Sequence, residues 1–410
     1  MRILIITTFL PYPITAGGIQ AQFNIINQLR SRHEVALLFP MSRDNKPEAM
    51  RALQLIWPEV KMYPFGYLQQ MLSPTFVFSK IRKAINRHLN PDKQNKNIRI
   101  ALEDYLFPAS YRYKTFLKDT IDSFQPNFIE VDFYQNINIG KYLPSNIKKV
   151  FIHHELRFVI IDRLTSSLPL NNKQKLRKEQ LKSQEIGNLN FFDAVITLTD
   201  TDKHQLIDAG VTVPVYSAPA AVSTELMPYK KWNNRLVFIG GYGHAPNPEG
   251  IDWFLNEVVP KVEWSRWPET ELLIIGKGWP EFYQGTHNNL PVRCLGFVED
   301  LKEYVHGSIV IVPVLTGSGM RMKILDAAAL SCPFISTHVG AEGLLFDNNT
   351  SCILAESSND FAHGLERLFT DESLRQNLAN NAHALFERYY SVDALSLLRE
   401  SIFEKIAKDN

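Results

Sequence analysis

The sequence is poor in cysteine, in net charge and in long apolar runs. Its three cysteines, Cys294, Cys332 and Cys352, have no metal-ligand spacing, and their scarcity is typical of a reducing compartment. The formal net charge is +1, which gives no overall field that would attract nucleic acid or an acidic partner. No apolar run reaches the roughly 18 residues that a membrane-spanning helix requires. We therefore expect a cytoplasmic protein without a transmembrane helix.

Short apolar runs rich in isoleucine, valine and phenylalanine recur along the 410 residues. Runs without polar alternation are typical of strands buried on both faces of a parallel sheet. Helical patterns separate them, as in doubly wound α/β units. The expected strands are 2–8, 34–39, 127–131, 149–153, 193–198, 235–240, 271–276, 308–313 and 333–338.

The polar segment 223–235 divides these strands into two series and predicts a domain boundary. We expect an α/β fold of two Rossmann-like, doubly wound domains facing each other across a cleft, because such sheets bind ligands at the carboxyl ends of their strands. The expected domains are 1–228 and 229–388. Residues 389–410 predict an amphipathic helix that either crosses back to the first domain or caps the second.

Two strand–loop–helix junctions carry glycine pairs, one in each half of the chain. Gly17 and Gly18 open the first helix, and the loop 240–250 contains Gly241 among four glycines, together with His244 and Asn247. A helix start reached through glycines can come close to a phosphate or a sugar. Each junction alone is also explained by a glycine-rich turn, but the pair favours a nucleotide-type ligand.

A third glycine loop runs directly into a helix whose first turns are charged. A helix start offers N–H groups and the positive end of its dipole to an anion, and nearby cations strengthen such a site. The alternative is an ordinary loop with a surface ion pair between residues 323 and 326. The motif consists of Gly317, Ser318, Gly319, Arg321, Lys323 and Asp326.

Two adjacent histidines, His153 and His154, stand at the end of the expected strand 149–153. A histidine more often makes a structural hydrogen bond than it catalyses a reaction. The carboxyl end of a parallel strand is, however, where α/β sheets bind their ligands. Both roles therefore stay open for this pair.

Several of these stretches together resemble one enzyme family, the GT-B glycosyltransferases of retaining family four (glycosyltransferase group 1). The resemblance covers nearly the whole chain, and it is strong over 235–345 and weaker before 230. It implies an N-terminal acceptor-side domain and a C-terminal domain that binds a nucleotide-diphosphate sugar. It also implies sugar transfer to a glycan or lipid-linked acceptor in surface polysaccharide or glycoconjugate synthesis. The stretches are "FIGGYGHAPNPEGIDWF", "LLIIGKG", "VRCLGFVEDLKEYV" and "IVIVPVLTGSGMRMKILDAAALSCPFISTHVGAEGL".

The resemblance assigns roles to residues at matching positions. It implies that Asp326 binds the ribose hydroxyls and that His154, with His153 as the alternative, lies beside the donor sugar. Glu342 in "VGAEGL" matches a loop near the donor. The family usually has an acidic residue where Ser318 stands, eight positions before Asp326.

A second departure concerns the diphosphate. The family usually has basic residues in the loop after the first strand of the second domain, but the loop 240–250 has none. Arg321 and Lys323, with the N–H groups of the 316–321 loop, are then the candidates to bind the diphosphate, together with Gly17 and Gly18. The family match of the loop 240–250 makes Gly241, His244 and Asn247 further donor-site candidates.

No aspartate-x-aspartate motif stands in the expected place, so we expect neither a metal nor a cofactor. The protein's own cations and amide dipoles should then stabilise the leaving diphosphate. Retaining enzymes of this kind are described as transferring the sugar on one face, with the leaving phosphate taking the acceptor proton. The alternatives are an epimerase or phosphorylase on the same fold and, because of Ser318, a non-catalytic nucleotide-sugar-binding or scaffold protein.

The segment 76–100 carries seven basic residues and one acidic residue between Lys80 and Arg99. Ile81, Ile85 and Leu89 recur at helical spacing, which predicts an amphipathic basic helix. A second basic stretch is 173–182. Such surfaces either face water or contact anionic lipid, and the second reading implies peripheral contact with the inner membrane face.

Overall fold

The chain folds into two compact units, each made of several segments of sequence. Unit 1 comprises Met1–Pro13, Ile25–Ala218 and Leu398–Asn410, and unit 2 comprises Ile14–Asn24 and Pro219–Leu397. The expected basic helix at 76–100 lies outside the described residues. The computed structural model describes residues 1–14, 17–42, 46–66, 102–103, 105–166, 168–220, 222 and 226–408.

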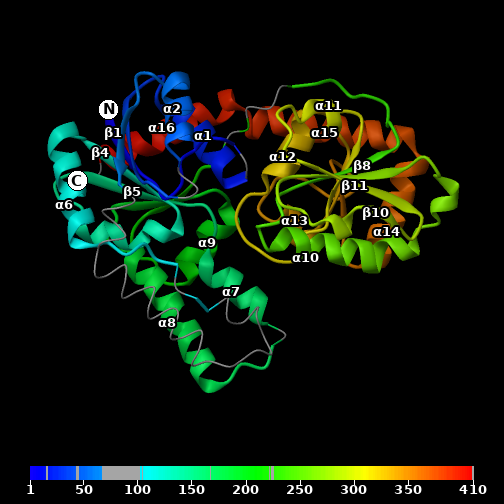
Figure 1. The fold of residues 1–410 in the computed structure, drawn as a ribbon, viewed down its shortest axis with the longest axis horizontal. Helices are drawn as coiled ribbons and strands as arrows, with labels where there is room; N and C mark the ends of the chain where they lie inside the picture. The colour runs from blue at the N-terminus through cyan, green and yellow to red at the C-terminus, as the bar shows by residue number, and fades with distance from the viewer. Residues whose placement is uncertain are drawn as a thin grey trace. The chain divides into compact units, whose positions relative to one another are not determined.

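Unit 1 is built on a seven-stranded sheet in the order β3-β2-β1-β4-β5-β6-β7 (Figure 1). All neighbouring strands pair in parallel. The chain first builds outward from β1 to β3 and then restarts at β4 on the other side of β1. The strand order therefore reverses between β1 and β4, where such sheets bind ligands. The strands are β1 Arg2–Ile6, β2 Glu34–Pro40, β3 Lys61–Phe65, β4 Phe128–Asp132, β5 Lys148–His153, β6 Ala194–Thr197 and β7 Val215–Ser217.

Helices cover both faces of this sheet. On one face, Ile129 and Val131 of β4 pack in a core cluster with side chains of α6. On the other face, Phe128 stacks on Phe403 of α16 (red in Figure 1), with ring centroids 4.7 Å apart. Helices α7 and α8 contact each other as a hairpin. The helices are α1 Gly17–Leu29, α2 Pro47–Ile56, α6 Tyr111–Phe124, the 3-10 helix η1 Tyr134–Tyr142, α7 Arg157–Thr165, α8 Asn172–Leu189, α9 Asp200–Asp208 and α16 Val392–Lys408.

Unit 2 repeats this design with a seven-stranded sheet in the order β10-β11-β9-β8-β12-β13-β14. Its neighbouring strands pair in parallel apart from β10 and β11, which form an antiparallel hairpin at one edge. The strand order reverses between β8 and β12. The strands are β8 Arg235–Ile239, β9 Glu271–Ile275, β10 Gly285–His287, β11 Leu290–Gly296, β12 Ile309–Val312, β13 Phe334–Thr337 and β14 Ile353–Ala355.

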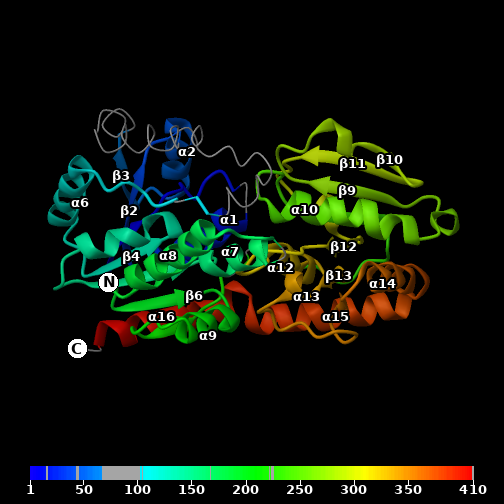
Figure 2. The same ribbon diagram turned by 90° about the horizontal axis from the view of Figure 1, so that it is seen from below.

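The helices of unit 2 pack on a core of large apolar side chains, which alternate along strands such as β8. Leu236 and Phe238 of β8 contact a cluster that includes Phe254 and Phe361. Figure 2 shows α14 and α15 side by side, and the two helices contact each other. The helices are α10 Pro246–Trp253, α11 Lys302–Val305, α12 Met322–Ala329, α13 His338–Ala341, α14 Ser358–Thr370 and α15 Glu372–Tyr389.

The expected fold class, two Rossmann-like α/β sheets, is confirmed by these two units. Each sheet has a point where its strand order reverses. In unit 2 the loops at this point follow β8 and β12 and carry residues that the sequence singled out, whereas in unit 1 His153 and His154 lie at the end of β5, one strand from the reversal between β1 and β4. The fold thus places the candidate residues of each unit at the end of the sheet where ligands bind.

Candidate active site

The loops at the reversal point of unit 2 approach each other so closely that glycine is required. A Cβ atom on Gly250 of α10 would lie 2.3 Å from the carbonyl oxygen of Pro313, which follows β12. A Cβ atom on Gly240, after β8, would lie 2.6 Å from the side-chain nitrogen of Asn247. Side chains at either glycine would push α10 away from the strand ends. The glycines therefore bring α10 against the loops that follow β8 and β12.

The loop before α12 turns through two glycines with positive φ angles, +115° at Gly317 and +80° at Gly319. Such angles strain a residue with a side chain. Arg321, at the N-cap of α12, folds back over this loop, and its Nη1 donates to the carbonyl oxygens of Ser318 and Gly319, the latter at 2.6 Å. Arg321 thus braces the loop and holds a positive charge at the start of the helix.

Lys323 is held by uncharged groups. Its Nζ donates to Oδ1 of Asn247 at 2.9 Å and lies 4.1 Å from the ring centroid of Phe238. The amide nitrogen of Asn247 in turn donates to the carbonyl oxygen of Gly241 at 2.8 Å. Part of the Lys323 side chain reaches solvent, but its ammonium group is enclosed. Hydrogen bonds therefore join Gly241, in the loop after β8, to Asn247 of α10 and Lys323 of α12.

The pKa of Lys323 is lowered to about 7, first by burial and then by the positive charge of Arg321. In the part of the chain that the structure describes, no carboxylate forms an ion pair with Lys323. The surface pair with Asp326, the alternative considered for this motif, is therefore not formed. An enclosed amine without a counter-charge is suited to an anion that arrives from solution.

Asp326 lies in the second turn of α12 and is 2% exposed. Its Oδ1 accepts a hydrogen bond from Nε2 of Gln20 in α1 at 3.3 Å. Gly17, the first residue of α1, faces the start of α12, since a Cβ atom there would lie 3.2 Å from Cγ of Met322. The segment 14–24 belongs to unit 2, so the structure brings Gly17 together with the start of α12.

The other predicted donor-site residues lie at the same end of the sheet. Gly18 follows Gly17 in the first turn of α1. His244 is exposed, and its N–H donates to the carbonyl oxygen of Gly241 at 3.4 Å. Glu342 follows α13, which packs closely on the strand ends because a Cβ atom on Gly340 would lie 2.3 Å from Oγ of Ser336. No contact between the side chains of Glu342 and Lys323 is recorded among the described residues.

In unit 1, His154 lies just after β5 and is 8% exposed. Its Nε2 lies 3.1 Å from Oδ1 of Asp132, at the end of the neighbouring strand β4. Its ring stacks on Phe133, with centroids 4.3 Å apart and planes 13° from parallel. Its Nδ1 has no hydrogen-bond partner among the described residues. The contacts fix the ring and leave one nitrogen for a further partner.

His153 points to the opposite face of β5 and is fully buried. Its Nε2 lies 2.9 Å from Oε1 of Glu185. The same carboxylate accepts hydrogen bonds from the backbone N–H groups of Arg157 and Phe158, at 3.0 and 2.9 Å. Glu185 therefore caps the start of α7, and His153 belongs to this structural bond network.

Sequence reasoning did not single out several contacting residues, namely Phe238, Gln20, Asp132 and Phe133. Phe238 and Gln20 carried no chemical signal, because each belongs to an ordinary strand or helix pattern. Asp132 had a recognisable one. It ends a buried apolar run that also contains Glu130, and acidic residues are rarely fully buried unless they have a partner.

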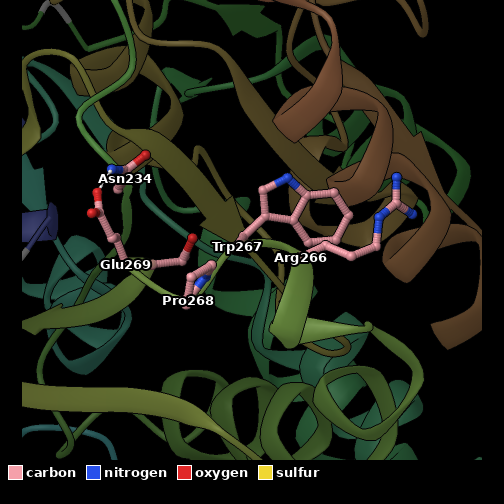
Figure 3. Close-up of a pocket in the computed structure, with 6 residues that line it drawn as sticks. Asn234, Arg266, Trp267, Pro268 and Glu269 are labelled. Atoms are coloured by element: carbon pink, nitrogen blue, oxygen red, sulfur yellow. Dashed lines mark hydrogen bonds between the residues drawn. The ribbon is translucent and has the colours of Figure 1, made fainter.

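The described residues form a pocket of about 230 Å³ at the opposite end of the unit 2 sheet, where β8 and β9 begin (Figure 3). Within it, Asn234 donates to Glu269 at 2.9 Å and Arg266 lies over the ring of Trp267. It therefore lies apart from the Lys323 site. The lining residues are Asn234, Arg266, Trp267, Pro268, Glu269 and Thr270.

Among the described residues, no group of three or more His, Cys, Asp or Glu side chains is arranged to hold a metal ion. Within the same residues, none of the helices has the length and apolar character to cross a bilayer.

Comparison with known families gives a match over part of the chain. The model of the family "Glycosyl transferases group 1" matches residues 233–371, which contain Lys323 and all its contacts. These residues therefore form a domain similar to the group 1 glycosyltransferases. Over 430 aligned residues, the chain is 21% identical to an uncharacterized 44.6 kDa protein in the cps region of Klebsiella pneumoniae, with 100% of both chains covered.

Solved structures share the fold of the chain. Sucrose-phosphate synthase from Thermosynechococcus elongatus matches with a TM-score of 0.69 at 14% identity over 99% of both chains. TarM from S. aureus matches with a TM-score of 0.68 at 11% identity over 100% of both chains. Anabaena HepE in complex with UDP matches with a TM-score of 0.66 at 12% identity, over 99% of this chain and 100% of that chain. The expected GT-B fold is thus confirmed, and the family match over residues 233–371 supports the expected enzyme class.

Proposed function

We propose that this glycosyltransferase transfers a sugar from a nucleoside diphosphate sugar to a glycan or lipid-linked acceptor, with retention of the anomeric configuration. The observation that carries the proposal is the environment of Lys323. Its ammonium group is enclosed by an amide and an aromatic ring, at the end of the sheet where α/β folds bind ligands. A diphosphate would supply the negative charge that this site lacks.

The site supports stabilisation of the leaving group. When the bond between sugar and diphosphate breaks, negative charge develops on the phosphate oxygens. Lys323 and Arg321 lie on the first turn of α12 and at its N-cap, so their charges add to the positive end of the helix dipole. One well-placed donor of this kind lowers a barrier by about 3–4 kcal/mol. The backbone N–H groups of Gly317, Ser318 and Gly319 are further candidate donors to the phosphates.

Asp326 is the candidate ligand of the ribose. It lies one helical turn after Lys323 on α12, so a nucleotide with its diphosphate at the helix start could reach both. Its Oδ1 now accepts from Gln20 at 3.3 Å, a long hydrogen bond that a ribose hydroxyl could replace. Gly17 and Gly18 leave the start of α1 open beside α12. Gly241, His244, Asn247 and Glu342 are proposed to line the rest of the donor site.

His154 is the better candidate than His153 for a residue beside the donor sugar. His153 is fully buried and its Nε2 is engaged by a carboxylate that also caps α7. His154 keeps a nitrogen without a partner among the described residues, and its ring is held by Asp132 and Phe133. In same-face transfer the leaving phosphate takes the acceptor proton, so His154 would orient the sugar rather than act as a base.

The relatives guide the choice of substrates to test. The cps region of the Klebsiella pneumoniae relative favours a surface polysaccharide as the product. The complexes of HepE and of TarM with UDP make uridine diphosphate sugars the first donors to screen. We also propose a cytoplasmic location with peripheral contact at the inner membrane face. The basic stretch 173–182 on α8 supports this contact, because Lys173 and Lys175 are exposed.

Turnover measured with a panel of nucleoside diphosphate sugars tests the proposal. Purified protein, donor and a membrane glycan extract should release nucleoside diphosphate, and NMR of the product should show the anomeric configuration of the donor. Arg321→Ala should weaken diphosphate binding by roughly 1.5–3 kcal/mol. Binding of nucleotide sugars without any turnover would identify a binding protein instead, and an inverted product would reject retention.

A further inference from the structure

Helix α8 extends beyond the carboxyl end of the unit 1 sheet. At the end of β5, Glu185 of α8 meets His153. At the start of β5, the backbone N–H of Asp193, shortly after the helix, donates to the carbonyl oxygen of Lys149. The helix therefore runs back along the strand, and its residues before Glu185 continue past the strand end. None of the residues 172–180 is buried, and Figure 1 shows the hairpin of α7 and α8 extending away from the sheet.

The other arm of this hairpin, α7, starts beside the candidate site. It begins at Arg157, three residues after His154, and it contacts α8. At a rise of 1.5 Å per residue, α7 is about 14 Å long. The hairpin tip, which we define as residues 168–176, therefore begins about one short helix away from His154.

The hairpin tip exposes apolar side chains beside a hollow of about 550 Å³. Leu176 is 61% exposed, and no residue of the tip is buried. Lys178 is held at the hollow because its Nζ lies 2.8 Å from Oδ1 of Asp162 on α7. Apolar side chains, two ammonium groups and one carboxylate thus share one open surface. The lining residues are Leu168, Pro169, Leu170, Lys175, Lys178 and Glu179.

The lysines of the hairpin tip stand where a helix disfavours cations. Lys173 and Lys175 are exposed near the start of α8, at the positive end of the helix dipole. The first turn has no acidic residue, and neither lysine forms an ion pair with a described residue. Residues 171–182 carry five basic residues and one acidic residue. A negatively charged surface would compensate both the dipole and the lysines.

We propose that the hairpin tip docks on an anionic phospholipid bilayer. Leu168, Leu170 and Leu176 enter the interface, and Lys173 and Lys175 contact the lipid phosphates. A bilayer supplies an apolar layer and negative charge together, whereas nucleic acid supplies only the charge. Docking places the candidate site close to the surface that carries a lipid-linked acceptor. This benefit rests on the proposed function, whereas lipid binding by the hairpin tip needs no sugar transfer.

Sedimentation of the full chain with vesicles tests the docking without any donor. The wild type should pellet at low salt with vesicles that contain phosphatidylglycerol and stay in solution with phosphatidylcholine alone. Lys173→Gln combined with Lys175→Gln should weaken vesicle binding by roughly thirtyfold, since each charge near anionic lipid is worth about 1 kcal/mol. Leu176→Gln should weaken it by about tenfold, because an apolar side chain is lost from the interface.

Two matched controls remove the same groups from other exposed helices of unit 1. Lys118→Gln combined with Lys408→Gln removes two exposed charges, and Leu55→Gln changes a leucine of α2 that is 85% exposed. Both controls should bind vesicles like the wild type.

The outcomes separate the docking from the proposed function. Equal weakening by the control variants would show that binding follows net charge or overall apolarity, and would overturn the docking site. Absence of pelleting by the wild type, or binding that the hairpin variants leave unchanged, would overturn it as well. If the hairpin variants weaken vesicle binding but the wild type turns over none of the donors, only the sugar transfer fails. Turnover without vesicle binding would reject the docking alone.

Discussion

Replacing Lys323 with methionine should change how the stability of the folded protein depends on pH. The pKa of Lys323 is lowered from 10.5 to about 7 in the folded protein. Between these two pH values the unfolded chain binds a proton at this side chain and the folded protein does not. The free energy of unfolding of the wild type must therefore rise with pH relative to that of Lys323→Met. The full effect is about 1.4 kcal/mol per pH unit, and partial solvent access should reduce it to roughly half.

The same pKa predicts proton uptake when the diphosphate binds. A bound diphosphate favours the charged form of Lys323, so above pH 7 the site must take up a proton from solution together with the ligand. The apparent affinity for a nucleoside diphosphate should then fall with rising pH, by up to about tenfold per unit between pH 7 and 9. Below pH 7 the side chain is already charged, and this source of pH dependence disappears.

Denaturant unfolding and titration calorimetry measure these two effects. The free energy of unfolding of the wild type and of Lys323→Met is measured from pH 7 to 9. Losses that do not change with pH, such as that of the hydrogen bond to Asn247, do not affect the slope against pH. Calorimetry at pH 8 in buffers of different ionisation enthalpy counts the protons taken up. Lys261→Met is the control, because Lys261 is exposed in the same unit. Parallel stability curves and no proton uptake at pH 8 would refute the assignment of Lys323 as an uncompensated buried amine.

Three further predictions concern other residues of the two units. Asp326→Ala should weaken binding of a free nucleoside by about 1.5–3 kcal/mol in calorimetry, because the ribose contact does not depend on the phosphates; unchanged nucleoside affinity would mean that Asp326 serves only to bind Gln20. His154→Ala should lower kcat far more than donor affinity. His153→Ala should instead lower the melting temperature, since it removes the buried partner of Glu185. The reverse pattern would exchange the roles of the two histidines. Gly250→Ala should destabilise unit 2 by roughly 1–3 kcal/mol in thermal unfolding, because its Cβ would meet Pro313, and an unchanged melting temperature would show that α10 can move.

The strands could be predicted where burial on both faces imposes a continuous apolar run. All the runs singled out in the sequence are strands within a few residues of the expected limits. Among the strands that were not predicted, β7 at Val215–Ser217 and β10 at Gly285–His287 are short and lie at sheet edges. β3 contains Pro64, which argues against a strand in sequence reading but is tolerated here because β3 is the edge of its sheet.

The residues of the candidate site could be predicted from the sequence, but the contacts between them could not. Glycine loops and charged helix starts are local signals, so Lys323 and Asn247 could each be named from sequence. Their hydrogen bond depends on how α10 and α12 pack at the reversal point of the sheet, which local patterns do not encode.

Each unit consists of separate stretches of sequence, and this limits how a domain can be exchanged with that of a relative. The simplest chimaera with a relative would replace the donor domain at a single junction near residue 219. Such an exchange would leave residues 14–24 behind, although they belong to unit 2, where Gly17 faces Met322 and Gln20 binds Asp326. It would also divide α16, whose residues from Leu398 onward belong to unit 1. A functional graft must therefore transfer two separate stretches of sequence and end inside a helix.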